Sequence, residues 1–89
     1  MNGRLIQAAL AVVNSAHRIA TASAAVADAE SRPWDYRAAG DLHVASGDLR
    51  TAQSGHRAAV LRWAGLCRRL SLSSTAADYL TEQGFELPE

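Results

Sequence analysis

The chain has 89 residues, 48% of them hydrophobic, and nine arginines balance nine acidic residues, so the formal net charge is zero. This length fits one domain with a single modest core. The lone cysteine, Cys67, excludes an internal disulfide and a zinc cluster built from cysteines, and no apolar run is long enough to span a membrane. Because nineteen residues are alanine, which buries little area, the chain is a candidate for a dimer or for docking on a larger partner.

The first 30 residues predict one long helix. An apolar stripe repeats in steps of four and three, which predicts a helix over residues 3–30. The stripe consists of Leu5, Ala9, Val12, Ala16, Ile19, Ser23 and Val26. This spacing is typical of an antiparallel bundle or a coiled-coil seam, so the stripe is a candidate homodimer interface. The run resembles a weak signal peptide, but Gln7 interrupts it and the amphipathic pattern continues, so we expect a cytoplasmic protein.

A second helix is predicted over residues 33–46. Pro33 suits the first turn of a helix and disfavours helix at the residue before it, which separates this helix from the first. Ser31 is the expected N-cap. Trp34 is expected to anchor the corner between the two helices by burying its ring.

A third helix is predicted over residues 48–70, after a tight turn at Ser46, Gly47 and Asp48. Gly47 suits the left-handed conformation that closes a helix, and Asp48 suits an N-cap. One face of this helix is apolar and includes His56, Trp63 and Cys67. The opposite side carries arginines only, and we expect these to bind a partner, to pair with nearby acids or to be solvated. The five candidates are Arg50, Arg57, Arg62, Arg68 and Arg69.

The histidines and the C-terminal segment complete the predicted domain. His56 is expected to be a hydrogen-bonded core residue, and His43 would approach it across the predicted turn, but no further ligand is spaced to complete a metal site.

A last helix is predicted over residues 75–83, with Thr75 as its cap and Gly84 closing it in a Schellman motif. The tail, residues 84–89, including Phe85 and Leu87, is expected to pack loosely on this domain. The predicted fold is therefore all-α, a bundle of about four helices built around the hairpin at residues 46–48.

Residues 34–64 resemble one tetratricopeptide repeat. Small and turn residues stand where such a repeat places them, and Tyr36 stands at its first large aromatic position. The small and turn residues are Ala39, Gly40, Gly47, Asp48, Ala52 and Ala59. Histidines replace two aromatics of the repeat and Ala64 replaces its closing proline. The resemblance implies a tight helical hairpin and protein–protein binding, and it implies no enzyme.

Charge along the chain is segregated, and this pattern bears on function. Residues 28–48 hold five acids and two arginines, whereas residues 49–69 hold five arginines and no acid. No catalytic motif or cofactor-binding loop is evident, so we expect a non-catalytic protein that binds another macromolecule with an acidic surface. An adaptor in a GC-rich bacterium and a phage or mobile-element inhibitor of a larger complex, such as a defence system, both fit. A nucleic-acid-binding protein that uses the arginine side of residues 48–70 is the alternative.

Overall fold

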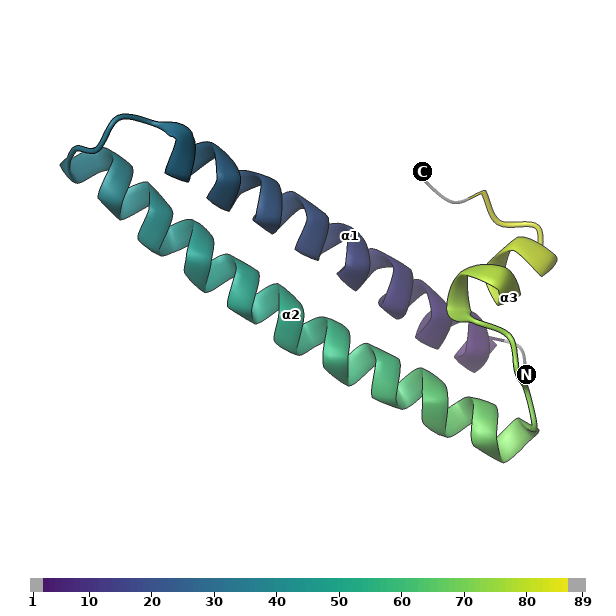
Figure 1. Ribbon diagram of the computed structural model, residues 1–89. Coiled ribbons are helices and arrows are strands. Elements are labelled where there is room, and N and C mark those ends of the chain that lie inside the picture. The colour runs from purple at the N-terminus through teal and green to yellow at the C-terminus, as the bar shows by residue number, and fades with distance from the viewer. Residues whose placement is uncertain (1–2, 87–89) are drawn as a thin grey trace.

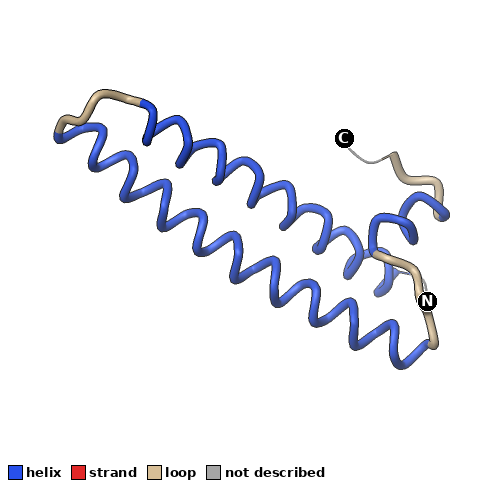
Figure 2. The backbone as a smooth tube through the Cα atoms, viewed as in Figure 1, coloured by secondary structure: helices blue, strands red, loops and turns tan. Residues whose placement is uncertain are grey.

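The computed structural model describes residues 3–86, which form two long antiparallel helices and one short helix. The helices are α1 (Gly3–Ser31), α2 (Tyr36–Leu70) and α3 (Ala76–Glu82). α1 and α2 lie side by side along their length, and α3 packs on the N-terminal end of α1 (Figure 1). All regular structure of residues 3–86 is helical (Figure 2), so the predicted all-α class is confirmed. The molecule is elongated, with principal extents of 52 × 23 × 18 Å.

The predicted division of residues 33–70 into two helices is wrong. α2 runs without a break for 35 residues through Ser46, Gly47 and Asp48. Among the described glycines only Gly84 has a positive φ, so Gly47 does not make the predicted left-handed turn. The physical reason is the buried face of α2. Ala38 and Ala45 are buried seven residues apart, and the half-buried Ala52 and Ala59 continue the same interval beyond Gly47. A turn at residue 47 would take the second pair off the face that packs on α1.

The hairpin of this protein lies at residues 32–35, between α1 and α2. The backbone N–H of Ala38 donates to Asp35 Oδ1 over 2.6 Å, which makes Asp35 the N-cap of α2. Ser31, the predicted cap, is the last residue of α1, and the helix begins three residues after Pro33. Arg32 closes the corner by donating to Asp28 at 2.6 Å and to Asp41 at 2.7 Å. The hydrogen bond to Asp28, and then that to Asp41, raises the pKa of Arg32.

Small side chains form the contact between α1 and α2. The buried residues repeat every seven positions and comprise Ala8, Ser15, Ala22 and Ala29 of α1 and Ala38 and Ala45 of α2. Ser15 Oγ lies 2.9 Å from Val12 O and 2.8 Å from Nδ1 of His56, so the one large polar group in this contact is hydrogen-bonded, as predicted for His56. The long first helix is confirmed, but its α2-facing stripe is rotated from the Leu5–Val26 stripe toward these small residues.

The hydrophobic core occupies one end of the hairpin, where α3 packs. It contains Trp63, Tyr79 and Leu80 among buried alanines, and Leu80 is fully buried. The rings of Trp63 and Tyr79 are 5.4 Å apart, and Trp63 Nε1 donates to the carbonyl of Ser74 over 3.3 Å. Three connected side chains therefore hold α3 against the two long helices.

The ends of α3 confirm the predicted last helix. The Asp78 N–H donates to Thr75 Oγ1 over 3.1 Å at its start. At its end Gly84 has φ 90°, its N–H donates to Thr81 O, and the Phe85 N–H donates to Leu80 O, which is a Schellman motif. The predicted contacts of Leu87 lie outside the described residues.

Candidate interaction surfaces

The five candidate arginines lie on the solvent side of α2, and we call them the arginine surface. Arg50, Arg57, Arg62, Arg68 and Arg69 are all exposed. Within residues 3–86 the ion pairs shorter than 4.0 Å both involve Arg32, so none of the five is paired there. Asp41, an acid of the same helix, binds Arg32 instead. The expected neutralisation of these arginines by acids of the same chain therefore does not occur within the described residues.

The arginine surface is also regularly spaced. Arg50, Arg57 and Arg68 are separated by seven and eleven residues, which is about 10 and 16 Å along a helix. Because α2 is continuous and packs on α1 over most of its length, these spacings are held by a scaffold and not by a loop. Arg62 and Arg69 lie about a third of a turn away, which widens the positive surface around the helix.

The hairpin corner exposes two aromatic rings. Trp34 is 81% exposed and Tyr36 is 92% exposed, with ring centroids 6.2 Å apart. The prediction that Trp34 buries its ring to anchor the corner is therefore wrong. Asp35 and Arg32 hold the corner by hydrogen bonds, which leaves both rings on the surface.

The histidines do not come together. His43 and His56 stand thirteen residues apart on one helix, a separation of about 20 Å, so the expected approach across a turn is also wrong. Within residues 3–86 there is no cluster of three metal-ligating side chains. His56 instead joins α2 to Ser15 of α1, where it satisfies a buried hydroxyl.

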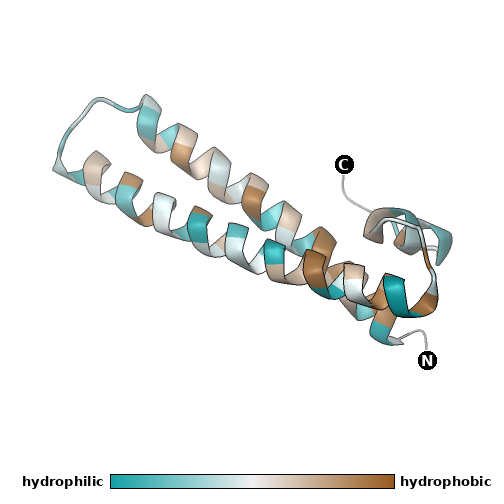
Figure 3. Ribbon diagram, turned by 60° about the horizontal axis from the view of Figure 1, so that its bottom comes forward, coloured by the Kyte–Doolittle hydropathy of each residue, from teal (hydrophilic) through white to brown (hydrophobic). Residues whose placement is uncertain are grey.

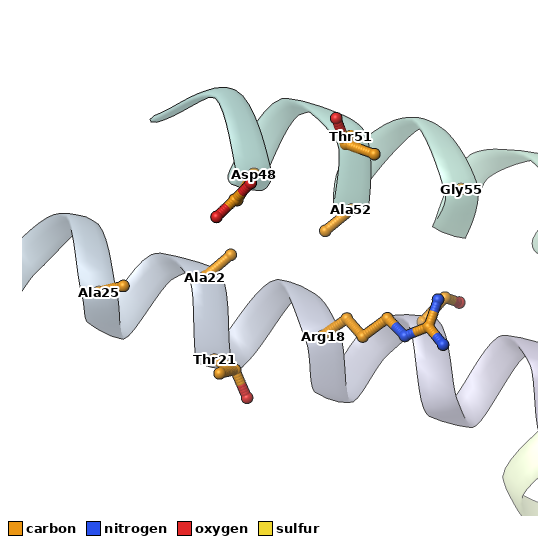
Figure 4. Close-up of a pocket in the computed structure, with 9 residues that line it drawn as sticks. Arg18, Thr21, Ala22, Ala25, Asp48, Thr51, Ala52 and Gly55 are labelled. Carbon is orange, nitrogen blue, oxygen red and sulfur yellow. The ribbon is translucent and has the colours of Figure 1, made fainter. Parts of the chain in front are cut away.

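One open side of the hairpin carries a hollow of about 410 Å³, lined by alanines and by polar side chains (Figure 4). Asp48 points across it toward Ala22 of α1, whereas Thr21 points away from α2. Arg18 and Thr51 contribute further polar groups at its edge. No hydrogen bond joins residues across this hollow apart from the Ser15–His56 contact at its margin.

The opposite side of the hairpin is a groove that α3 covers at one end only. Its open part is lined by apolar residues and also by Gln53, His56 and Arg57. Leu5, Val12, Ile19 and Val26 repeat every seven residues along α1 and share one line of that helix. The first two pack against the α3 core, whereas Ile19 lines an open hollow of about 570 Å³. α2 shows the same division between a covered and an open part, since Cys67 packs on the core and Val60 lines the hollow. We call the uncovered part the α3-side groove.

The α3-side groove continues to the hairpin corner. A second hollow, of about 510 Å³, follows the first and is lined by Leu42, Ser46 and Trp34 among others. Hydrophobic segments accordingly occur along both long helices, well beyond α3 (Figure 3). The sequence contains the signal for this groove, because the Leu5–Val26 stripe is longer than a seven-residue helix can cover.

The molecule exposes more surface than a compact protein of its mass. Its accessible area is 6594 Å². A globular protein of 9.5 kDa exposes roughly 5,000 Å². Its radius of gyration is 16.5 Å, against about 12 Å for a compact domain of this length. The excess of about 1,500 Å² is large enough to supply an interface.

Comparison with known proteins identifies no relative. Neither α1 nor α2, nor any other helix within residues 3–86, has an apolar stretch sufficient to cross a bilayer. The resemblance of residues 34–64 to a tetratricopeptide repeat stays a prediction about sequence, since its expected turn is part of a continuous helix. No protein family, curated protein or solved structure matches this chain.

Proposed function

We propose that this chain is a non-catalytic interaction protein that binds an acidic surface of another protein through the arginine surface. One observation carries the proposal: all five arginines are exposed and, within residues 3–86, none makes an ion pair. Five uncompensated positive charges on one helix cost self-repulsion, and an acidic partner removes that cost.

The chemistry of the side chain favours a carboxylate-rich partner. A guanidinium presents donors in a planar fork that matches a carboxylate, and it is more weakly hydrated than an ammonium group. Charges of this kind steer association and select partners. Aromatic residues and arginines also dominate binding energy at protein interfaces, and Trp34 and Tyr36 are exposed on the same chain.

Nucleic acid is the second candidate, and the spacing of Arg50, Arg57 and Arg68 along a continuous helix favours it, because such a row can follow phosphates. The acidic stretch 28–48 at the other end of the same hairpin opposes it, since it would repel a polyanion that extends beyond the arginines. We therefore rank an acidic protein first.

The test is a double charge reversal, Arg68→Glu with Arg69→Glu. The matched control, Arg4→Glu with Arg18→Glu, makes the same charge change at exposed positions of α1. Each protein is immobilised and used to capture partners from a cell extract, and circular dichroism confirms equal helix content. We expect the α2 variant to lose the captured proteins and the control to retain them. Equal capture by both variants would show that the arginine surface is not the interface.

A labelled DNA duplex and a labelled single-stranded RNA distinguish the second candidate. Phosphate binding must weaken linearly with the logarithm of salt concentration, because counterions are released on binding. We expect no binding at physiological salt. Tight, salt-sensitive binding that the α2 variant loses would replace the acidic protein by nucleic acid.

A further inference from the structure

We infer that a second copy of this chain packs antiparallel onto the α3-side groove, so that two hairpins form a four-helix arrangement with one α3 at each end. The inference goes beyond the proposed function, because it concerns a second copy of this chain and needs no other protein. The groove shares Arg57 with the arginine surface, whereas Arg68 and Arg69 do not line it.

The groove is the part of the core that the described chain leaves unfinished. α3 has seven residues, so it covers only about 10 Å of helices that are about 40 to 50 Å long. Under α3 the long helices bury Ala8 and Ala9 almost completely. Beyond α3, the heptad-spaced residues of the two long helices continue with Ile19 of α1 and Val60 of α2. No helix of the described chain covers this part, and two hollows are open there.

The two ends of the groove are complementary to each other. At the corner end Trp34 is 81% exposed. At the α3 end Val60 is 40% exposed and Leu61 is 66% exposed, and both line the groove. A two-fold axis across the middle of the groove sets each Trp34 on the Val60–Leu61 pair of the other copy. The contact between the Trp34 ring and the Val60–Leu61 pair then forms at both ends of the interface, as two-fold symmetry requires.

Charge selects the antiparallel orientation. The corner end carries the acidic stretch 28–48, with a net charge of −3, and residues 49–69 carry five arginines and no acid. Antiparallel copies place each acidic stretch beside Arg50 and Arg57 of the other copy, and they leave Arg68 and Arg69 outside the overlap for another partner. Parallel copies would place like charge on like charge, which is unfavourable across an interface.

The size of the overlap suits a stable dimer. From Trp34 to Leu61 the contact is about 40 Å long. Two helices about 10 Å apart make it about 20 Å wide, or roughly 800 Å² on each copy. This is the area that a standard interface buries on each partner. α3 limits the overlap, because the corner of the second copy reaches it and goes no further.

The first test is the mass in solution, by sedimentation equilibrium over a range of concentrations. We expect a dimer for the native sequence, and at least a tenfold higher dissociation constant for each of Trp34→Ala and Leu61→Ser. Val44→Ser is the matched control, since Val44 is 62% exposed on the other side of the hairpin. It should leave the dissociation constant unchanged. A native protein that stays monomeric at 100 micromolar concentration (about 1 mg/ml), or a dimer that only Val44→Ser weakens, would overturn the inference.

A cross-link tests the orientation. The midpoint between Trp34 and Leu61 is near Asp48, and Asp48 lies across from Ala22 of α1 (Figure 4). The neighbouring Ser23 is exposed and lies seven and fourteen residues from Ala16 and Ala9 on the groove side, so it stands next to the two-fold axis. In a Cys67→Ser background, Ser23→Cys should cross-link to its own copy with a short bis-maleimide. Thr21→Cys, on the other side of α1, should not.

Two variants test the dimer and the proposed function independently of each other. Arg68 and Arg69 lie beyond the overlap, so Arg68→Glu with Arg69→Glu should stay dimeric while losing the acidic partner. Trp34→Ala should become monomeric in the same assay. A charge-reversed protein that is monomeric, or a Ser23→Cys protein that fails to cross-link as a dimer, would contradict the proposed register.

Discussion

Replacing Gly47 by alanine gives opposite results for a continuous helix and for a turn at residues 46–48. In the structure Gly47 is within α2, its φ is not positive, and a Cβ at this position meets nothing within 4 Å. Alanine therefore gains helix propensity and loses no packing. The expected gain in the free energy of unfolding is about 0.8 to 1 kcal/mol. In a left-handed turn alanine would instead cost about 1 to 2 kcal/mol.

The assay is urea unfolding followed by far-ultraviolet circular dichroism at one protein concentration. Gly84→Ala is the matched control, because Gly84 has φ 90° and also has open space around its Cβ. We expect Gly47→Ala to raise the unfolding midpoint and Gly84→Ala to lower it, with similar slopes. A fall of the midpoint for Gly47→Ala would refute the continuous helix and restore the predicted hairpin.

Three further substitutions test the core and the helix ends. Leu80→Ala should lower the free energy of unfolding by about 3 kcal/mol, since Leu80 is fully buried. Val44→Ala, at a position that is 62% exposed and lies outside the groove, should cost under about 0.5 kcal/mol in the same urea titration. Ser71 caps α2 with φ 54°, so Ser71→Gly should raise the free energy of unfolding by about 0.5 to 1 kcal/mol, and a melting temperature that falls would contradict the strain. Ser15→Ala should cost about 1 kcal/mol because it leaves Nδ1 of His56 without its partner, and Ser15→Ala with His56→Leu should recover part of that loss.

Helix type and helix ends with local causes were predictable from the sequence. The long first helix follows from a period of 3.6 residues, and the last helix follows from Thr75 and Gly84, whose caps involve neighbouring residues only. The predicted helix break at Gly47 was wrong, because glycine permits a left-handed turn without requiring one. The seven-residue repeat that runs from the buried Ala38 and Ala45 to the half-buried Ala52 and Ala59 packs on α1 and decided against the turn. That packing is a tertiary effect.

The surfaces were predictable only in part. The exposure of the arginines follows from their place opposite the apolar face of residues 48–70, and it is confirmed. The exposure of Trp34 was missed because a large ring predicts burial unless something else holds the corner, and here hydrogen bonds from Arg32 and to Asp35 do so. The α1–α2 contact was missed because its alanines are weaker as a hydrophobic pattern than the larger residues beside them.

The uneven placement of the core implies a gradient of local stability along the hairpin. The end that contains Trp63, Tyr79 and Leu80 holds the large buried side chains, whereas the corner end is packed by alanines and held by exposed ion pairs. Backbone amides near residues 20–30 and 38–48 should then exchange with solvent through partial openings, while those near Trp63 exchange only on global unfolding. In a single hairpin the corner can therefore separate and close again without loss of the α3 core, and Trp34 stands at the end that opens most easily.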